Sequence, residues 1–576
     1  MKRSNVHWAL LAFIGLTILL TYPMAFQLTR LMLDAGAGED AFIFVWNIWW
    51  LKAALLELHT NPYVTDFIFY PDGTHLALHT FPLPASLLGA ALSFFRPGLD
   101  GLVAGYNLVI LVSFVLTALG TYLLVLRLTG SRSAAFVAGL VVAFTHYRFS
   151  NTVRLHCLET GVLAFAAWSL VGLVQEKRAR WGVLVGLFTA ALLYSSVEYL
   201  AYLLIGVFLA AVYFTIRDRS SIWNRKMIAP KIWGAGVFTL LALPMLAALI
   251  SHGVGGEAQA TAHAEIFSAD VFDVLVPNPK HPMFGGWSEV IERELHGGEA
   301  GFGLSVSLVS LVLAIWAVVT GTRSRTWPWA ALGLFFFLLS LGPIVHVGGH
   351  RTGVPSLYRG LSFLVPWLEI SRTPMRAVVG LELCLAILAG FALAPTPGSS
   401  PRRLVVTTVI GAVLLFELLP GPFSMTRVDT HPFYREMAAN RAEGAVLELP
   451  PRDRRALLHQ MIHGRNIAAV RRVYPRAPDW SLSFWQSEGF REFLDTLFRP
   501  EKVEALTPAS RALLVSNHRR LLAGHGFRFV ILDKTAIPAP EREQALIILR
   551  EMAPEYVLED ERLAVFEYGA STSEVR

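Results

Sequence analysis

An acidic pair close to the start of the chain could do chemistry. Glu39 and Asp40 follow Gly38 and lead into an aromatic run made up of Phe42, Phe44, Trp46, Trp49 and Trp50. The pair comes just after an apolar stretch that is long enough to cross a bilayer. Two carboxylates at the mouth of a membrane span, followed by an amphipathic helix, indicate chemistry at the membrane surface.

Further ionisable side chains lie within or beside apolar stretches, where a charge is costly and marks a candidate functional site. In the topology derived below they all fall toward the same face as Asp40, which predicts a polar cavity open to that face. For Glu159 and Glu417, helix capping or snorkelling to the interface stays an equal alternative. The residues are His146, Arg148, Arg154, His156, Glu159, Glu198, Arg372, Arg376, Glu382 and Glu417.

The composition is that of a membrane protein. Of the 576 residues, 54% are hydrophobic and 16% are charged, whereas a soluble protein has about 25% charged residues. The net charge of +6 does not indicate a nucleic-acid partner, because the Lys and Arg residues lie in short loops between apolar stretches. Cys157 and Cys384 lie in apolar segments and form neither a metal motif nor a disulfide framework.

The fold class expected is mainly α, a polytopic bundle of about eleven membrane spans. The stretch 8–29 is longer than the apolar core of a signal peptide, so we interpret it as a retained signal anchor. The apolar stretch 82–95 is short and broken by proline, which indicates a re-entrant or surface helix. The predicted spans are 8–29, 102–126, 134–149, 157–174, 181–196, 199–216, 232–250, 303–321, 327–345, 376–395 and 404–420.

The distribution of positive residues predicts the orientation of the bundle. With the N-terminus inside, the short inner loops hold most of the Lys and Arg residues of segment 1–420 and only Glu176 and Asp218 as acids. The large outer loops 30–101 and 251–302 reverse this balance. The sequence therefore predicts an N-in, C-out protein of a bacterial cytoplasmic (inner) membrane, with Asp40 on the outer face.

The chain divides into two predicted domains. Residues 1–420 form the transmembrane module, and residues 421–576 become rich in charges with only short apolar runs. Strand patterns at 445–449, 527–532 and a hairpin at 556–566 alternate with helical patterns at 484–498, 509–523 and 539–552. We predict a small extracytoplasmic α/β domain.

The aromatic run after Asp40 predicts a helix over 41–58 that lies along the lipid headgroups. An aromatic belt would explain its tryptophans but not the acids before them. Asp40 is also well suited to be the N-cap of this helix, and capping does not prevent a carboxylate from facing a cavity.

The order of several short motifs resembles the GT-C superfamily of membrane glycosyltransferases, which includes protein mannosyltransferases and the aminoarabinose transferases of lipid A. More closely, the chain is similar to uncharacterised bacterial members of that superfamily. Each motif is loose by itself, but together they cover nearly the whole chain. They include Gly38-Glu39-Asp40-Ala41-Phe42, Phe69-Tyr70-Pro71-Asp72-Gly73, Gly105-Tyr106-Asn107-Leu108, His146-Tyr147-Arg148, Arg372-Thr373-Pro374-Met375-Arg376 and the stretch 444–450.

The resemblance implies an inverting transferase that moves a sugar from a polyprenyl-phosphate donor to an acceptor hydroxyl at the extracytoplasmic face. Asp40 matches the first-loop acid that acts as general base, with Glu39 in support. Arg372 and Arg376 match a segment that would bind the donor phosphate, where negative charge develops. Arginines outside the membrane run against the positive-inside bias, which favours this role over a plain interfacial one.

The resemblance also implies a second group of ligand contacts. Arg148 and Arg154 are the alternative donor-phosphate residues. Glu198 departs from the family pattern, because an uncharged residue is expected there. The expected sugar or acceptor contacts are His146, His156, Glu198 and Glu299.

Three alternatives stay open: a polymerase or ligase of O-antigen type, a non-enzymatic lipid or polysaccharide transporter, and a scaffold derived from the family. The early acidic loop and the C-terminal domain favour the transferase, and the nearly uncharged inner halves of the spans disfavour a transporter. The expected partners are membrane lipids, the lipid-linked sugar and a glycan, lipid or protein acceptor. The sequence assigns no metal ligands, and a requirement for a divalent cation stays open.

Overall fold

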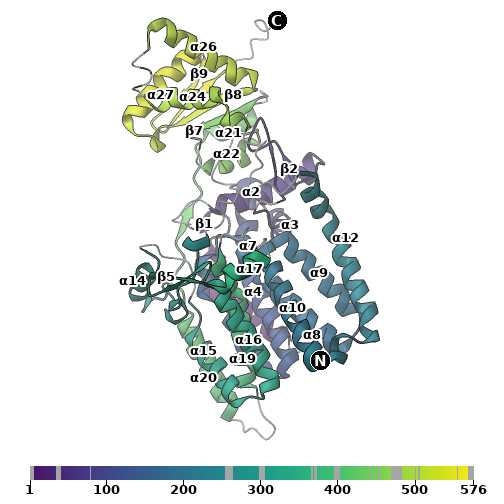
Figure 1. Ribbon diagram of the computed structural model, residues 1–576. Helices are drawn as coiled ribbons and strands as arrows, with labels where there is room; N and C mark the ends of the chain where they lie inside the picture. Colours follow the sequence, from purple (N-terminus) through teal and green to yellow (C-terminus); the bar gives the residue numbers. More distant parts are fainter. Residues whose placement is uncertain are drawn as a thin grey trace.

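The computed structural model has a helical bundle with an α/β domain at one end (Figure 1). The structure describes residues 6–33, 40–77, 80–252, 264–297, 305–364, 368, 373–394, 402–440, 443–451, 454–468, 483–499, 501, 503, 506–553 and 555–568.

Each predicted span corresponds to a helix. Within the described chain, five helical segments are long and apolar enough to cross a membrane: Gly98–Thr129, Leu155–Glu176, Val197–Arg217, Arg225–Ala247 and Pro374–Leu393. The bundle helices are α1 (Val6–Leu20), α4 (Gly98–Thr129), α5 (Arg132–Ala143), α8 (Thr160–Glu176), α9 (Ala179–Ser195), α10 (Val197–Arg217), α12 (Ile228–His252), α15 (Leu308–Thr320), α16 (Arg323–Ser340), α19 (Val378–Leu393) and α20 (Arg402–Glu417).

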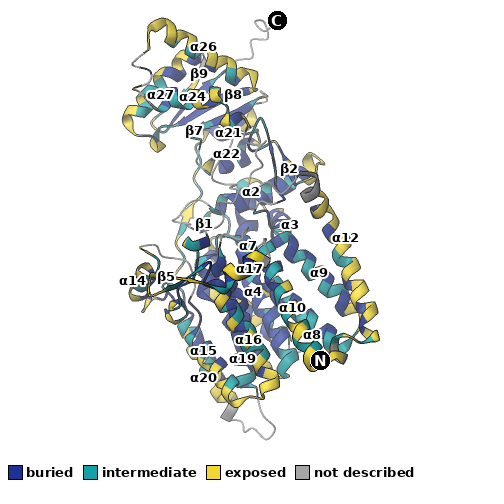
Figure 2. Ribbon diagram, in the orientation of Figure 1, coloured by how far each residue is buried: buried dark blue, intermediate teal, exposed yellow. Residues whose placement is uncertain are grey.

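The bundle keeps apolar side chains on its outside as well as in its core. Helices α4 and α19 are mostly buried, whereas α10 and α12 expose Phe208, Trp233 and Leu240 (Figure 2). A helix that is apolar all round fits a lipid environment, because lipid tails replace the buried core as its apolar surroundings. Glu417 caps α15: it accepts hydrogen bonds from the Ser307 hydroxyl (2.6 Å) and the Val309 amide (3.2 Å).

The first span is shorter than predicted. Helix α1 ends at Leu20, and the chain continues through the 3-10 turn η2 (Met24–Phe26) into strand β1 (Leu31–Leu33). Pro23 cannot donate the backbone hydrogen bond that a continuing helix requires. β1 pairs antiparallel with β6 (Met425–Arg427), which follows the last bundle helix.

The first outer loop is built on two helices. α2 (Asp40–Lys52) ends in one turn of π-helix, η3 (Ala53–Glu57), and α3 (Leu83–Ser93) packs against α2 and α4. The expectation that 41–58 lies along the headgroups is wrong, because nine of the thirteen α2 residues are buried. The Trp46 indole donates a hydrogen bond to Gln460 of the C-terminal domain (2.7 Å), so this tryptophan contacts protein rather than lipid headgroups. The hairpin of β2 (Val64–Thr65) and β3 (Thr74–His75) completes the loop.

The second large outer region folds around a buried carboxylate. Asp270 accepts hydrogen bonds from the backbone amides of Phe272 (2.9 Å), Gly348 (3.1 Å) and Gly349 (2.9 Å). These bonds tie the loop after α12 to a hairpin between α16 and α19. The region contains η5 (Asp273–Leu275), α14 (Gly285–Leu295), β4 (Ile344–Val347), β5 (His350–Pro355) and α17 (Leu357–Leu364).

The C-terminal domain has a four-stranded sheet in the order β7-β8-β10-β9. β7 and β8 are parallel and the other pairs are antiparallel. The predicted strands and helices of residues 421–576 agree within a few residues with β7 (Ala445–Leu449), α23 (Ser483–Gln486), α24 (Glu488–Phe498), α26 (Pro508–Gly524), β8 (Phe527–Asp533), α27 (Ala539–Met552), β9 (Glu555–Glu559) and β10 (Leu563–Glu567). The sequence patterns did not predict the helices α21 (Phe433–Ala439) and α22 (Arg455–His463).

Candidate functional site

Asp40 is held between two arginines from distant parts of the chain. Its carboxylate accepts from the Arg154 guanidinium at 2.8 Å and from the Arg454 guanidinium on its other oxygen. Its side chain is 20% exposed. Within the described chain, Asp40 bonds these guanidinium groups rather than the first amides of α2. The observed contacts therefore do not support the helix-capping role, although the acid does complement the N-terminal end of the helix dipole.

Arg154 is fixed by the short helices between α5 and α8. α6 (His146–Ser150) and α7 (Leu155–Leu158) enclose the turn that carries it. The Asn151 side chain accepts from Arg154 (3.1 Å), and the Tyr106 hydroxyl donates to the Val153 carbonyl (2.8 Å). Tyr106, buried in α4, therefore holds the backbone that places Arg154 beside Asp40.

Arg454 comes from the C-terminal domain, directly before α22. This helix is docked on the first outer loop through the Gln460 side chain, which accepts from Trp46 and donates to the Phe67 carbonyl (2.5 Å). The sequence analysis did not select Arg454. A signal was present, because Arg452, Arg454 and Arg455 form a basic cluster after a predicted outer strand, against the positive-inside bias.

A second ion pair joins Arg376 to Glu198 at 2.5 Å. Arg376 precedes α19 in the turn η6 (Pro374–Ala377), and Glu198 lies in the first turn of α10. The unexpected acid at 198 therefore has an arginine partner. The guanidinium has five N–H groups, so it retains donors for a further ligand.

The two ion pairs flank one short segment. Arg154 and Arg376 both lie within electrostatic range of Cys157. The adjacent His156 ring stacks on Phe44 of α2 at a centroid distance of 5.6 Å. His156 thus lies at the Asp40 site, between the first outer loop and the bundle.

A lysine adds positive charge on the other side of Arg154. Lys280 donates to the Phe149 carbonyl (3.1 Å) and lies within electrostatic range of Arg154 and Glu292. Burial lowers the pKa of Lys280, with Arg154 lowering it further and Glu292 opposing the shift. His146 lies beside Lys280 and contacts the Ser150 hydroxyl (3.3 Å). The sequence analysis did not select Lys280, although a lysine in the acidic loop 251–302 is a recognisable candidate.

Arg148 has a different environment from Arg154. It is fully buried, and its guanidinium donates to the carbonyls of Ala143 (3.0 Å) and Leu158 (2.8 Å) and to the Ser113 hydroxyl (3.1 Å). It also lies over the Phe114 ring. A donor phosphate would have to displace these contacts, so Arg148 is not used in the proposal below.

Three of the candidates selected from sequence, Glu39, Arg372 and Glu299, lie outside the described residues. Asp40, Arg154 and His156 come together at one site, and the ion pair of Arg376 with Glu198 lies within electrostatic range of Cys157. Among the described residues, no three His, Cys, Asp or Glu side chains gather as metal ligands would.

No protein-family model and no curated protein sequence matches the chain. Among solved structures, the arabinofuranosyltransferase AftD from Mycobacteria aligns at a TM-score of 0.57 with 14% identity, over 99% of this chain and 42% of that chain. The oligosaccharyltransferase of Archaeoglobus fulgidus aligns at 0.49 with 11% identity, over 92% of this chain and 70% of that one. ArnT from Cupriavidus metallidurans, solved with undecaprenyl phosphate, aligns at 0.43 with 12% identity, over 99% and 100%.

The last two scores are too low to establish a shared fold. The alignment with AftD covers nearly all of this chain, which spans less than half of that enzyme. The likeness at this identity concerns architecture and not substrates. The chain shares the fold of the aligned part of that arabinofuranosyltransferase, a fold consistent with the predicted GT-C architecture.

Proposed function

We propose that the protein is an inverting glycosyltransferase that takes a sugar from a polyprenyl-phosphate donor and transfers it to an acceptor hydroxyl. The observation that carries the proposal is the Asp40 carboxylate, clasped by Arg154 of the bundle and Arg454 of the C-terminal domain. This arrangement places a candidate general base next to cations that can bind a phosphate, in a chain whose fold is consistent with the GT-C architecture.

Asp40 accepts the proton of the acceptor hydroxyl as the hydroxyl oxygen attacks the anomeric carbon. The bond from that carbon to the phosphate oxygen breaks, and polyprenyl phosphate leaves with the electron pair. Attack opposite the leaving group inverts the anomeric centre. Each carboxylate oxygen has two lone pairs, so Asp40 can accept this hydrogen bond while an arginine still holds it in position.

The positive groups around Asp40 stabilise the leaving phosphate. Arg376 is the first candidate, because Glu198 positions it and leaves further N–H groups for phosphate oxygens. Arg154 and Lys280 supply additional positive charge on the Asp40 side. Donor binding can also draw Arg454 from Asp40 to the phosphate, which would free one carboxylate oxygen for the acceptor.

We also propose that this site faces the extracytoplasmic side of a bacterial inner membrane. The orientation rests on the excess of Lys and Arg in the predicted inner loops. Both native cysteines are buried, so an impermeant thiol reagent should react only with introduced cysteines. Asp66→Cys, in the first outer loop, should be labelled in intact spheroplasts, and labelling only after lysis would reverse the topology.

The activity is tested with purified protein in lipid vesicles and undecaprenyl-phosphate-linked mannose, glucose or arabinose as donors. We expect one of these sugars to be released from the lipid in the presence of cell-envelope glycans, with undecaprenyl phosphate as the other product. Release of none of the sugars, or transfer only from undecaprenyl-pyrophosphate-linked sugars supplied in a parallel assay, would contradict the proposed donor class.

A further inference from the structure

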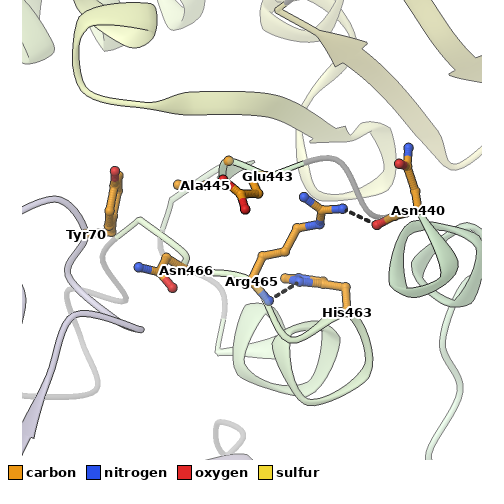
Figure 3. Close-up of a pocket in the computed structure, with 8 residues that line it drawn as sticks. Tyr70, Asn440, Glu443, Ala445, His463, Arg465 and Asn466 are labelled. Carbon is orange, nitrogen blue, oxygen red and sulfur yellow. Dashed lines mark hydrogen bonds between the residues drawn. The ribbon is translucent and has the colours of Figure 1, made fainter. Parts of the chain in front are cut away.

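A second cavity lies away from Asp40, where the first outer loop meets the C-terminal domain (Figure 3). Its volume is about 400 Å³, within the usual range of small-ligand sites of roughly 300–1,000 Å³. Tyr70 of the outer loop lies on one side, and Glu443, His463, Arg465 and Asn466 of the C-terminal domain lie on the other.

Backbone hydrogen bonds hold the two sides of this cavity together. The Tyr70 amide donates to the Ile467 carbonyl (3.1 Å), and the Ile467 amide donates to the Phe67 carbonyl (2.9 Å). The Tyr70 ring meets Phe527 edge-on at a centroid distance of 5.5 Å. Arg465 donates to the Asn440 carbonyl (2.8 Å), a contact drawn in Figure 3. The cavity is therefore built by both domains.

His463 contributes a neutral ring to the lining of this cavity. Its Nδ1 accepts from the Arg465 amide at 3.1 Å, so the neutral ring carries its hydrogen on Nε2. The ring is 6% exposed, and the Nε2 atom is covered by protein and has no hydrogen-bond partner among the described residues. Burial lowers the pKa of His463 to about 3, with smaller contributions from His459 and Arg465. The ring therefore adds no positive charge to the cavity near neutral pH.

We propose that this cavity binds one sugar unit of the acceptor glycan. Sugar hydroxyls both donate and accept, and the cavity offers both: the Arg465 guanidinium donates, the Glu443 carboxylate accepts, and the Asn466 amide and Tyr70 hydroxyl do either. The charges of Arg465 and Glu443 offset each other, which suits neutral hydroxyl groups better than it suits a phosphate.

The position of the cavity sets a minimum length for the acceptor. This step rests on the proposed function of Asp40. Arg454 at Asp40 and His463 at the cavity stand at the two ends of α22, which has nine residues. Such a helix is about 13 Å long, farther than one sugar ring reaches. The acceptor is therefore an oligosaccharide that places its reacting hydroxyl at Asp40 and a more distant unit in the cavity.

The test measures binding rather than turnover, on the full chain in detergent, with fluorescent mono-, tri- and pentasaccharides of mannose, galactose, glucose and arabinose. We expect a pentasaccharide to bind, and Asn466→Ala and Tyr70→Phe each to weaken binding about fivefold, as for the loss of one hydrogen bond. Asn517→Ala, an exposed asparagine on α26, is the matched control and should bind as the wild type does.

Asp40→Asn separates this inference from the proposed function. It should retain pentasaccharide binding while transfer is lost. If no oligosaccharide binds, or if both cavity variants bind as the wild type does, the cavity is not a sugar site. If transfer continues in Asp40→Asn while the cavity variants still weaken binding, the proposed base is wrong and the sugar site stands.

Discussion

Arg148 and Arg154 both lie in the connection between α5 and α8, yet their surroundings differ. The Arg148 side chain is completely buried, and its donors bind carbonyls and hydroxyls of the bundle. The Arg154 side chain is 35% exposed and binds Asp40. Arg148 has the environment of a residue that joins helices, whereas Arg154 has the environment of a residue that can meet a ligand.

Residue type alone therefore does not identify a ligand-binding arginine. An arginine whose donors are satisfied by fixed backbone acceptors contributes to stability. One that faces a carboxylate at an accessible site can exchange that partner for a phosphate. The predictions below test whether the two environments lead to these two roles.

The largest effect should come from Asp40→Asn. The amide cannot take the proton of the acceptor, so the rate of sugar transfer should fall by about 10²–10⁴-fold. The measurement is sugar release from the lipid donor at saturating substrate. Asp66→Asn, an exposed acid in the same outer loop, is the control. Transfer at the wild-type rate in Asp40→Asn would remove Asp40 as the base.

The next effect separates the two arginines directly. Arg148→Met leaves several buried acceptors without donors and should lower the free energy of unfolding on the order of 3 kcal/mol. Arg154→Met should change stability little and should lower the rate of transfer. Both are measured by thermal unfolding in detergent together with the transfer assay. Equal losses in the free energy of unfolding for the two variants would contradict the assignment of Arg148 to stability and Arg154 to ligand binding.

Local sequence patterns gave most of the helices, because apolar runs of span length and the alternation in residues 421–576 are strong local signals. They did not predict that α2 is buried in protein. Trp46 is an interfacial residue by type, but Gln460 from the C-terminal domain covers it. The Asp40 site could not be predicted from local patterns either, because Arg454 pairs with Asp40 although most of the chain separates them in sequence. Long-range pairings of this kind leave no periodic signal.

The role of the C-terminal domain at the site predicts a smaller effect. Arg454→Gln removes one of the two cations on Asp40 and should lower transfer about tenfold while the protein still folds. The exposed neighbour Arg455, changed to Gln, serves as the control. Were the two variants equally active, the C-terminal domain would have no part in the chemistry.

The smallest effect concerns pH. Burial lowers the pKa of His463 to about 3 and that of His518 to about 4, against about 6.5 in an unfolded chain. Between these values the unfolded state binds protons that the folded state does not, so stability falls as the pH drops from 6.5 toward 4.5. His463→Phe should flatten this dependence in thermal unfolding. An unchanged slope would show that His463 is accessible to protons when folded.

Native mass spectrometry of the protein purified from its own membranes tests the central claim most directly. The account predicts a bound species whose fragments are a polyprenyl phosphate and a sugar, with less of it bound to Arg376→Ala because that variant lacks the main phosphate contact. Bound phospholipids alone, or the same amount of lipid-linked sugar on Arg376→Ala, would contradict the account.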